Sequence, residues 1–236
     1  YLLSREVAKH CKVVQSGQGA DELFAGYHWY PQVDGASDPY AAYREAFFDR
    51  SYDEYKATVQ PQWLTANDAA GDFVREHFAQ PGADAGVDKA LRLDSTVMLV
   101  DDPVKRVDNM MAWGLEARTP FLDYRLAELS ARIPARFKLP GGGKQVLKEA
   151  ARRVIPSEVI DRKKGYFPVP GLKHLQGDTL NWVRDLLLDP SQDRGLFQPA
   201  MLDRLLTHPQ SQLTPLNGSK LWQLAALNLW LSEQGI

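Results

Sequence analysis

A glycine-containing segment with two adjacent carboxylates is the clearest candidate for chemistry in this sequence. It reads Ser16-Gly17-Gln18-Gly19-Ala20-Asp21-Glu22 and follows a short apolar stretch. The glycines let the backbone turn tightly and approach a nucleotide, and the N–H groups that open a following helix can face phosphate oxygens. Asp21 and Glu22 offer the carboxylate oxygens that hold Mg²⁺ against pyrophosphate. The same residues also fit an ordinary glycine turn into a helix that begins with acids, which the helix dipole favours.

The pattern around this segment predicts a mostly helical α/β chain. A brief strand is expected at 12–15, with helices at 2–10 and 20–27 on either side, and no second strand is expected. Further helices are predicted at 39–50, 52–59, 66–79, 87–101, 104–112, 124–132, 144–154, 172–188, 199–206 and 218–233. The last of these is apolar on most of its circumference, as a buried helix is. Because one strand cannot satisfy its own hydrogen bonds, the series predicts the final part of a doubly wound sheet with a helical lobe.

Three segments in this order resemble the asparagine synthetase family. Residues 16–22 are similar to its S-G-x-G-[AS]-D-E stretch, and 104–123 to a helix and loop with a GLEAR-x-PFLD core. Residues 162–167 resemble an R-x-K-x-x-F element. The resemblance covers nearly the whole chain and implies that residues 1–236 are the C-terminal part of an adenine nucleotide α-hydrolase-like synthetase domain. Gln18, Ala25, the 164–170 stretch and the tail around Trp222 look most like the N-acetylglutaminylglutamine amidotransferases.

The resemblance implies an ATP-dependent activation of a carboxylate. ATP adenylates a small-molecule or short-peptide carboxylate and releases Mg²⁺-pyrophosphate, and ammonia from an upstream glutaminase domain then forms the amide. Negative charge develops on the leaving pyrophosphate, so metal-binding carboxylates and a fixed cation are needed there. The implied roles are nucleotide binding for Ser16, Gly17 and Gly19, metal binding for Asp21 and Glu22, catalysis for Lys164 and Gln18, and substrate binding for Glu116, Arg118 and Asp123.

Several of these residues have a second interpretation. Lys164 can face phosphate or can belong to a solvated basic run with Arg162 and Lys163. Arg118 can shape the substrate site or form a structural salt bridge with Glu116 or Asp123. Gln18 stands where asparagine-synthesising enzymes usually have glutamate. Because its amide cannot accept a proton, Gln18 argues against a general base at this position and against aspartate as the substrate.

Other features exclude some functions. The Gly141-Gly142-Gly143-Lys144 run lacks P-loop spacing and is interpreted as a turn opening a helix. The net charge of -2 gives no basic footprint for nucleic acid, and no apolar run approaches a membrane span. Cys11 is the one cysteine; it fits a reducing, cytoplasmic setting and is expected to pack inside.

The family's S-G-G-L-D-S pyrophosphatase loop and its glutaminase domain do not occur in this sequence, which begins with Tyr1 and not with Met. We therefore expect the rest of the active site to lie upstream and the isolated chain to be inactive. The alternative is a helical interaction or regulatory module that derives from the synthetase and has no catalytic role.

Overall fold

The computed structural model describes residues 1–101, 107, 109–162, 175–190 and 194–235. The chain divides into two compact units, which are treated separately below. Unit 1 comprises residues 1–43 and 73–163, and unit 2 comprises 44–72 and 164–236. Within the described ranges, no helix combines the length and the apolar character that crossing a bilayer requires.

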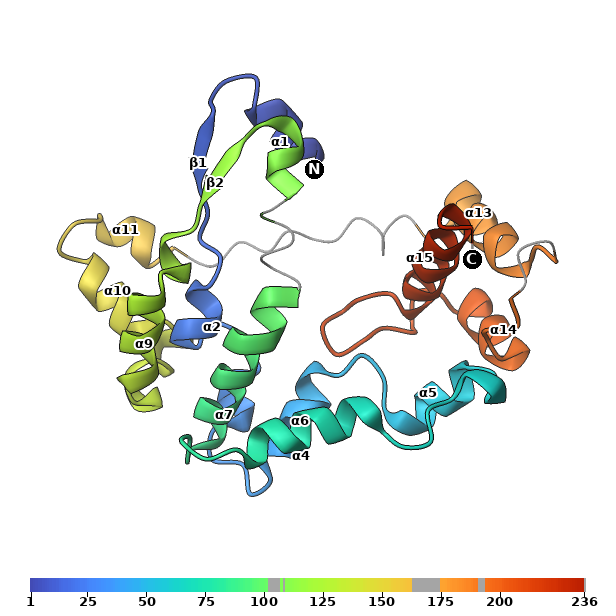
Figure 1. The fold of residues 1–236 in the computed structure, drawn as a ribbon, viewed down its shortest axis with the longest axis horizontal. Helices are drawn as coiled ribbons and strands as arrows, with labels where there is room; N and C mark the ends of the chain where they lie inside the picture. The colour runs from blue at the N-terminus through green and yellow to red at the C-terminus, as the bar shows by residue number, and fades with distance from the viewer. Residues whose placement is uncertain (102–106, 108, 163–174, 191–193, 236) are drawn as a thin grey trace. The chain divides into compact units, whose positions relative to one another are not determined.

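Unit 1 contains a small parallel sheet of two strands. β1 (Val13–Gln15) pairs with β2 (Glu116–Arg118), with Val13 opposite Glu116 and Gln15 opposite Arg118. Figure 1 shows the two strands side by side. The expectation of a single strand was therefore wrong. The sequence Glu-Ala-Arg carries no β-branched or aromatic residue, so β2 owes its conformation to pairing with the backbone of β1 and not to local propensity.

Most other elements among the described residues of unit 1 are helices or short turns. They are α1 (Leu2–Val7), α2 (Ala20–Phe24), α3 (Tyr30–Val33), α7 (Gly86–Leu93), α9 (Tyr124–Arg132), α10 (Gln145–Ala151) and α11 (Ser157–Ile160), with the 3₁₀ turns η4 (Asn109–Trp113), η5 (Pro120–Leu122), η6 (Ala135–Phe137) and η7 (Pro140–Gly142). Two helices, α4 (Pro39–Phe47) and α6 (Ala69–Ala79), have residues in both units.

One helix of unit 1 ends earlier than the apolar periodicity predicts. The helix expected at 20–27 stops at Phe24, because Ala25 adopts a left-handed conformation with φ of 55°. The helix expected at 87–101 is confirmed: α7 passes at Asp94 into the π-helical turn η2 (Asp94–Met98), and helical backbone continues to residue 101. Of the helix expected at 104–112, residues 104–106 and 108 lie outside the described residues, and its end forms the 3₁₀ turn η4. Cys11 is exposed, so the expectation that it packs inside was also wrong.

The short helix α2 is held from several sides. It packs against α9, α10 and η2, and Figure 1 shows α9 and α10 beside it. Leu23 and Phe24 are buried, and the Phe24 ring meets Phe121 edge-on with centroids 6.4 Å apart. The hydroxyl of Ser130 on α9 donates to the Leu23 carbonyl oxygen. These contacts fix a helix that is too short to be stable alone.

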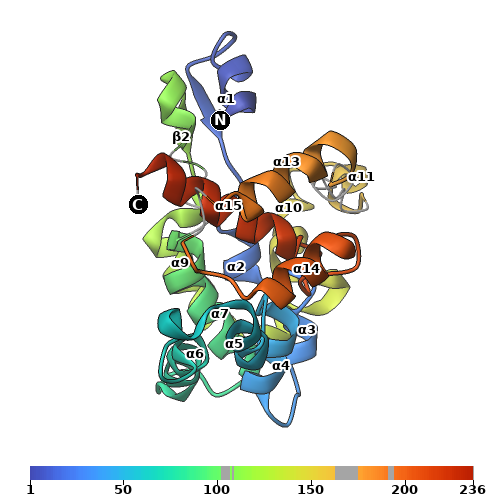
Figure 2. The ribbon, with the colours of Figure 1, turned by 90° about the vertical axis from the view of Figure 1, so that its right-hand side faces the viewer.

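Unit 2 is a helical cluster. It contains α5 (Tyr52–Thr58), η1 (Pro61–Trp63), α13 (Gly177–Leu188), α14 (Pro199–Thr207) and α15 (Lys220–Glu233). The last three pack on one another, as Figure 2 shows, around a core of Leu175, Val183, Leu187, Met201, Leu202, Leu205, Leu206, Leu221, Leu224 and Ala225. Ser219 caps the start of α15 by accepting from the Trp222 N–H. Trp222 and Trp230 are exposed, so α15 is buried on one face and not on most of its circumference.

Candidate active site

The pairing of β1 with β2 brings together two segments that lie about one hundred residues apart. The Ser16 N–H donates to the Arg118 carbonyl oxygen at 2.8 Å, so both strands end at the same edge of the sheet. The chain after β1 then meets the chain after β2 at Gly19, where φ is +94°. A Cβ atom on Gly19 would lie 2.5 Å from Leu122 Cδ2 and 3.3 Å from the Phe121 carbonyl oxygen. Only glycine allows this close approach.

The loop between β1 and α2 (residues 16–19) has an open side. A Cβ atom on Gly17 would meet no heavy atom within 4 Å, so the backbone there faces open space. The Ser16 hydroxyl accepts from the Gln18 N–H at 3.4 Å and stabilises the turn. Gln18 is half-buried. This combination of an exposed glycine backbone and a fixed turn is suited to receiving a ligand at the carboxyl end of a strand.

Asp21 and Glu22 have different surroundings although they are adjacent. The Asp21 side chain is 24% exposed, and its Oδ1 lies 3.0 Å from Lys144 Nζ. The absence of a side chain at Gly26 leaves space for the Asp21 carboxylate, because a Cβ atom on Gly26 would lie 2.1 Å from Asp21 Oδ1. Glu22 is only 1% exposed, and its Oε1 accepts from the Tyr27 hydroxyl at 2.5 Å. Of the two, Asp21 is the carboxylate that a ligand can reach from solvent.

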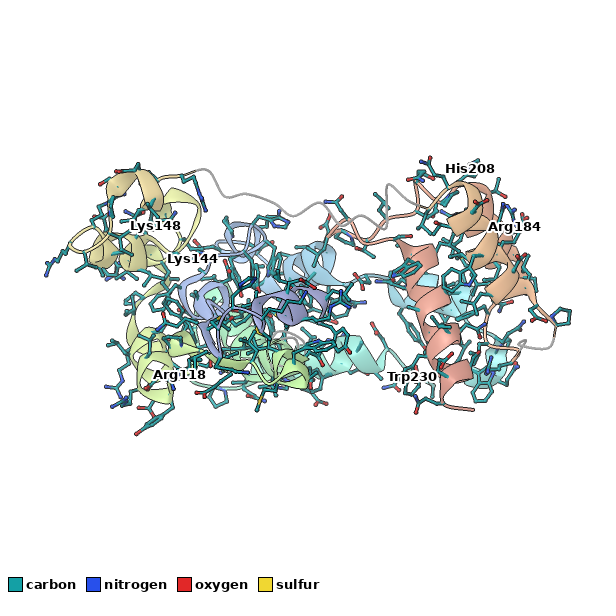
Figure 3. The ribbon with its side chains drawn as sticks, turned by 90° about the horizontal axis from the view of Figure 1, so that it is seen from above. Arg118, Lys144, Lys148, Arg184, His208 and Trp230 are labelled. Carbon is teal, nitrogen blue, oxygen red and sulfur yellow. The ribbon has the colours of Figure 1, made fainter. Side chains whose placement is uncertain are left out.

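Lys144 was missed as a site residue. Its segment was interpreted only as a turn opening a helix, and it does precede α10. The three glycines before it have φ of 63°, 77° and 88°, and Lys144 itself has φ of 59°. The Lys144 N–H donates to the Phe24 carbonyl oxygen at 2.8 Å, which docks the turn on the end of α2. Figure 3 labels Lys144 at this turn and Lys148 on α10, which follows it. The run of three glycines before Lys144 was the signal in the sequence that could have marked it as a site residue. That run does not indicate which carboxylate pairs with the lysine.

The predicted substrate residues each have a partner close in sequence. Arg118 Nε donates to Glu116 Oε1 at 2.8 Å, so Arg118 forms one of the two salt bridges considered from the sequence. Asp123 is the N-cap of α9 and accepts from the Arg125 N–H at 2.9 Å. The Arg125 guanidinium donates to both Asp123 oxygens, at 3.0 and 2.7 Å. These bonds lower the pKa of Asp123 to about 2. Glu116, the first residue of β2, and Arg118, its last, are both exposed.

The site offers a metal ion one accessible carboxylate ligand and not a complete set of protein ligands. Among the described residues, no group of three or more His, Cys, Asp or Glu side chains is placed to hold a metal ion. Mg²⁺ usually binds through one or two carboxylates together with substrate phosphates and water. Asp21 beside the open loop fits that donor set. Lys164 and its neighbour Lys163, the predicted phosphate cation and its alternative, lie outside the described residues.

Comparison with known proteins gives consistent matches. The sequence model of the asparagine synthase family matches residues 1–232. Asparagine synthetase [glutamine-hydrolyzing] 1 of Bacillus subtilis (strain 168) is 27% identical over 267 residues, which cover 98% of this chain and 42% of that protein. Asparagine synthetase [glutamine-hydrolyzing] 3 of the same organism is 30% identical over 215 residues, 86% of this chain and 34% of that protein. Asparagine synthetase B of Escherichia coli (strain K12) is 27% identical over 187 residues, 78% of this chain and 25% of that protein. The chain therefore spans less than half the length of these relatives.

Proposed function

Because this chain belongs to the asparagine synthase family, we propose that it is part of an ATP-dependent, glutamine-hydrolysing ligase that adenylates a carboxylate and amidates it with ammonia. The observation that supports this most is the junction of the two loops at Gly19. It places the open backbone at Gly17 and the carboxylate of Asp21 at the carboxyl end of a parallel strand pair. This edge is where open α/β sheets bind nucleotides.

The charges around Asp21 suit the departure of pyrophosphate. In this proposal, Asp21 holds Mg²⁺, which supplies positive charge to the phosphates, and the backbone of Ser16, Gly17 and Gly19 lines the nucleotide. Glu22 lies behind Asp21 and supports the first turn of α2. Lys144, 3.0 Å from Asp21, adds a cation at this place. Lys164 supplies a second cation for the pyrophosphate, as proposed from its motif. A fixed cation near developing negative charge stabilises the transition state without reorganising.

The acceptor carboxylate is proposed to be N-acetylglutaminylglutamine in preference to aspartate. Gln18 lies in the loop that bears the open glycine, and its amide can donate and accept hydrogen bonds but cannot take up a proton. Glu116 and Arg118, exposed at the first and last positions of β2, are proposed to contact the acceptor together with Asp123. A peptide-like acceptor offers amide groups that pair with such polar side chains.

The test is pyrophosphate release by the full-length enzyme, measured with ATP, Mg²⁺ and each acceptor in turn. We expect faster release with N-acetylglutaminylglutamine than with aspartate. A clear preference for aspartate would mean that the enzyme synthesises asparagine and that the proposed acceptor is wrong. No release with either acceptor, from a folded full-length protein, would favour the non-catalytic module.

A further inference from the structure

A buried carboxylate lies behind the candidate site and plays no part in the proposed chemistry. Asp94, the first residue of η2, is 0% exposed. Its Oδ2 accepts from the Tyr30 hydroxyl at 2.6 Å, and its Oδ1 accepts from the Tyr43 hydroxyl. Side chains from α3 and α4 therefore converge on Asp94. The Trp29 ring packs beside Tyr30, with centroids 5.8 Å apart.

This cluster continues to the residue beside Asp21. The rings of Trp29 and Tyr27 stack, with centroids 4.2 Å apart and an interplanar angle of 14°. The Tyr27 hydroxyl donates to Glu22 Oε1 at 2.5 Å. The Tyr27 ring also lies beside the Tyr30 ring, with centroids 5.8 Å apart. A continuous series of contacts thus runs from Asp94 through Tyr30 and Tyr27 to Glu22, and we refer to these four residues with Trp29 as the Asp94 network.

The end of the network depends on a single described hydrogen bond. Glu22 Oε2 is buried and has no hydrogen-bond partner among the described residues. The orientation of Glu22 therefore rests on the bond from Tyr27 to its other oxygen. Because α2 has only five residues, Glu22 and Asp21 share its first turn.

The position of Asp94 in the backbone is also unusual. It stands where α7 passes into the π-helical turn η2, and α2 packs against η2. π-helical turns are rare and occur frequently at functional sites. A buried carboxylate is costly unless it is hydrogen-bonded, and here hydroxyls from two other helices donate to Asp94.

We propose that Asp94 is a positioning residue that, through Trp29, Tyr30 and Tyr27, fixes Glu22 and thereby the first turn of α2 with Asp21. The inference rests on the proposed function, since Asp21 matters only if this edge binds Mg²⁺ and nucleotide. The competing account is that Asp94 contributes to the stability of the core and to nothing else.

The experiment uses the full-length enzyme with Asp94→Asn and Tyr27→Phe, singly and together. The first readout is hydrogen–deuterium exchange of the peptide covering residues 16–24, which we expect to become faster in each variant. The second is the Mg²⁺ concentration for half-maximal pyrophosphate release, which we expect to rise about tenfold, as is typical when a group behind a metal ligand is removed. The double variant should differ from wild type by no more than the larger single effect, because both changes break the same series of contacts.

Val87→Ala is the matched control. Val87 is fully buried in α7, one element before Asp94, so this change should lower the melting temperature without altering the exchange of residues 16–24 or the Mg²⁺ requirement. An Asp94→Asn enzyme that changes only in melting temperature would overturn the proposal, as would additive effects in the double variant. If the wild-type enzyme releases no pyrophosphate, the proposed function fails, and the exchange measurement still decides whether Asp94 positions the loop.

Discussion

The Nζ atom of Lys144 lies 3.0 Å from Oδ1 of Asp21, and the two residues are 123 positions apart in the chain. The pair is about three-quarters buried on both sides, at 25% and 24% exposure. Such a pair is less screened by salt than a surface pair and holds its geometry better. It makes the turn before α10 part of the candidate site.

Lys144→Met should reduce pyrophosphate release by the full-length enzyme by about tenfold or more, because it removes the cation and keeps most of the apolar side chain. Lys9→Met is the control, since Lys9 pairs with Glu6 on an exposed surface. Steady-state assays of both variants at saturating ATP check this. Equal activity of the two variants would show that Lys144 only supports the turn.

Asp21→Asn should leave the fold intact and lower pyrophosphate release by about 10²-fold, the usual loss for one transition-state electrostatic contact. Asp53→Asn removes a comparable acid from an exposed pair with Lys56 and should have no effect on release. Circular dichroism checks that the variants are folded, and pyrophosphate release is measured as a function of Mg²⁺ concentration. Near wild-type turnover of Asp21→Asn at saturating Mg²⁺ would mean that Asp21 does not bind the metal ion and acts only as an acidic residue in the first turn of α2.

Gly143→Ala should destabilise unit 1 and displace Lys144. A Cβ atom there would lie 2.0 Å from the Ala25 carbonyl oxygen, and φ is +88°. Gly82→Ala is matched for backbone strain, because Gly82 has φ of +94° with no atom within 4 Å of a Cβ. We expect the Gly143 variant to lose about 2 kcal/mol more than the Gly82 variant, from the clash added to the strain. Urea unfolding measures both, and equal losses would mean that the turn is not docked on α2.

The stability of unit 1 should depend on the protonation of Asp94. Burial raises the pKa of Asp94 to about 6, the hydrogen bonds from Tyr30 and Tyr43 oppose this rise, and the charge of Glu22 adds to it. A raised folded pKa means that the protonated acid is favoured in the folded state. Stability from this group is therefore fully present below pH 3.8 and is lost as the pH rises through about 6.

The pKa difference of roughly 2 units corresponds to at most about 3 kcal/mol. Urea unfolding of wild type and Asp94→Asn between pH 4 and pH 7 checks this dependence. The upper limit of this range lies about one unit above the folded pKa of Asp94. The wild type should lose more stability across this range than the variant. Parallel curves would mean that Asp94 does not titrate there.

Local signals in the sequence were sufficient to predict several of the secondary-structure elements. The short strand before the glycine loop was confirmed within one residue, and α15 begins where Ser219 can cap it. Family membership likewise followed from the order of three motifs, and the family match over residues 1–232 confirmed it. These signals act within a few residues, through capping, glycine conformations and apolar spacing, so a single sequence carries them.

Contacts between distant segments were decided by the tertiary structure. β2 has no propensity of its own and exists because β1 offers hydrogen-bonding groups beside it. Asp21 and Glu22 are adjacent acids of similar chemistry, and packing alone makes one accessible and the other buried. Lys144 reaches Asp21 because left-handed backbone angles dock its turn on Phe24 and Ala25. No spacing along the chain reports which surfaces meet, because packing between elements depends on the shape of all of them at once.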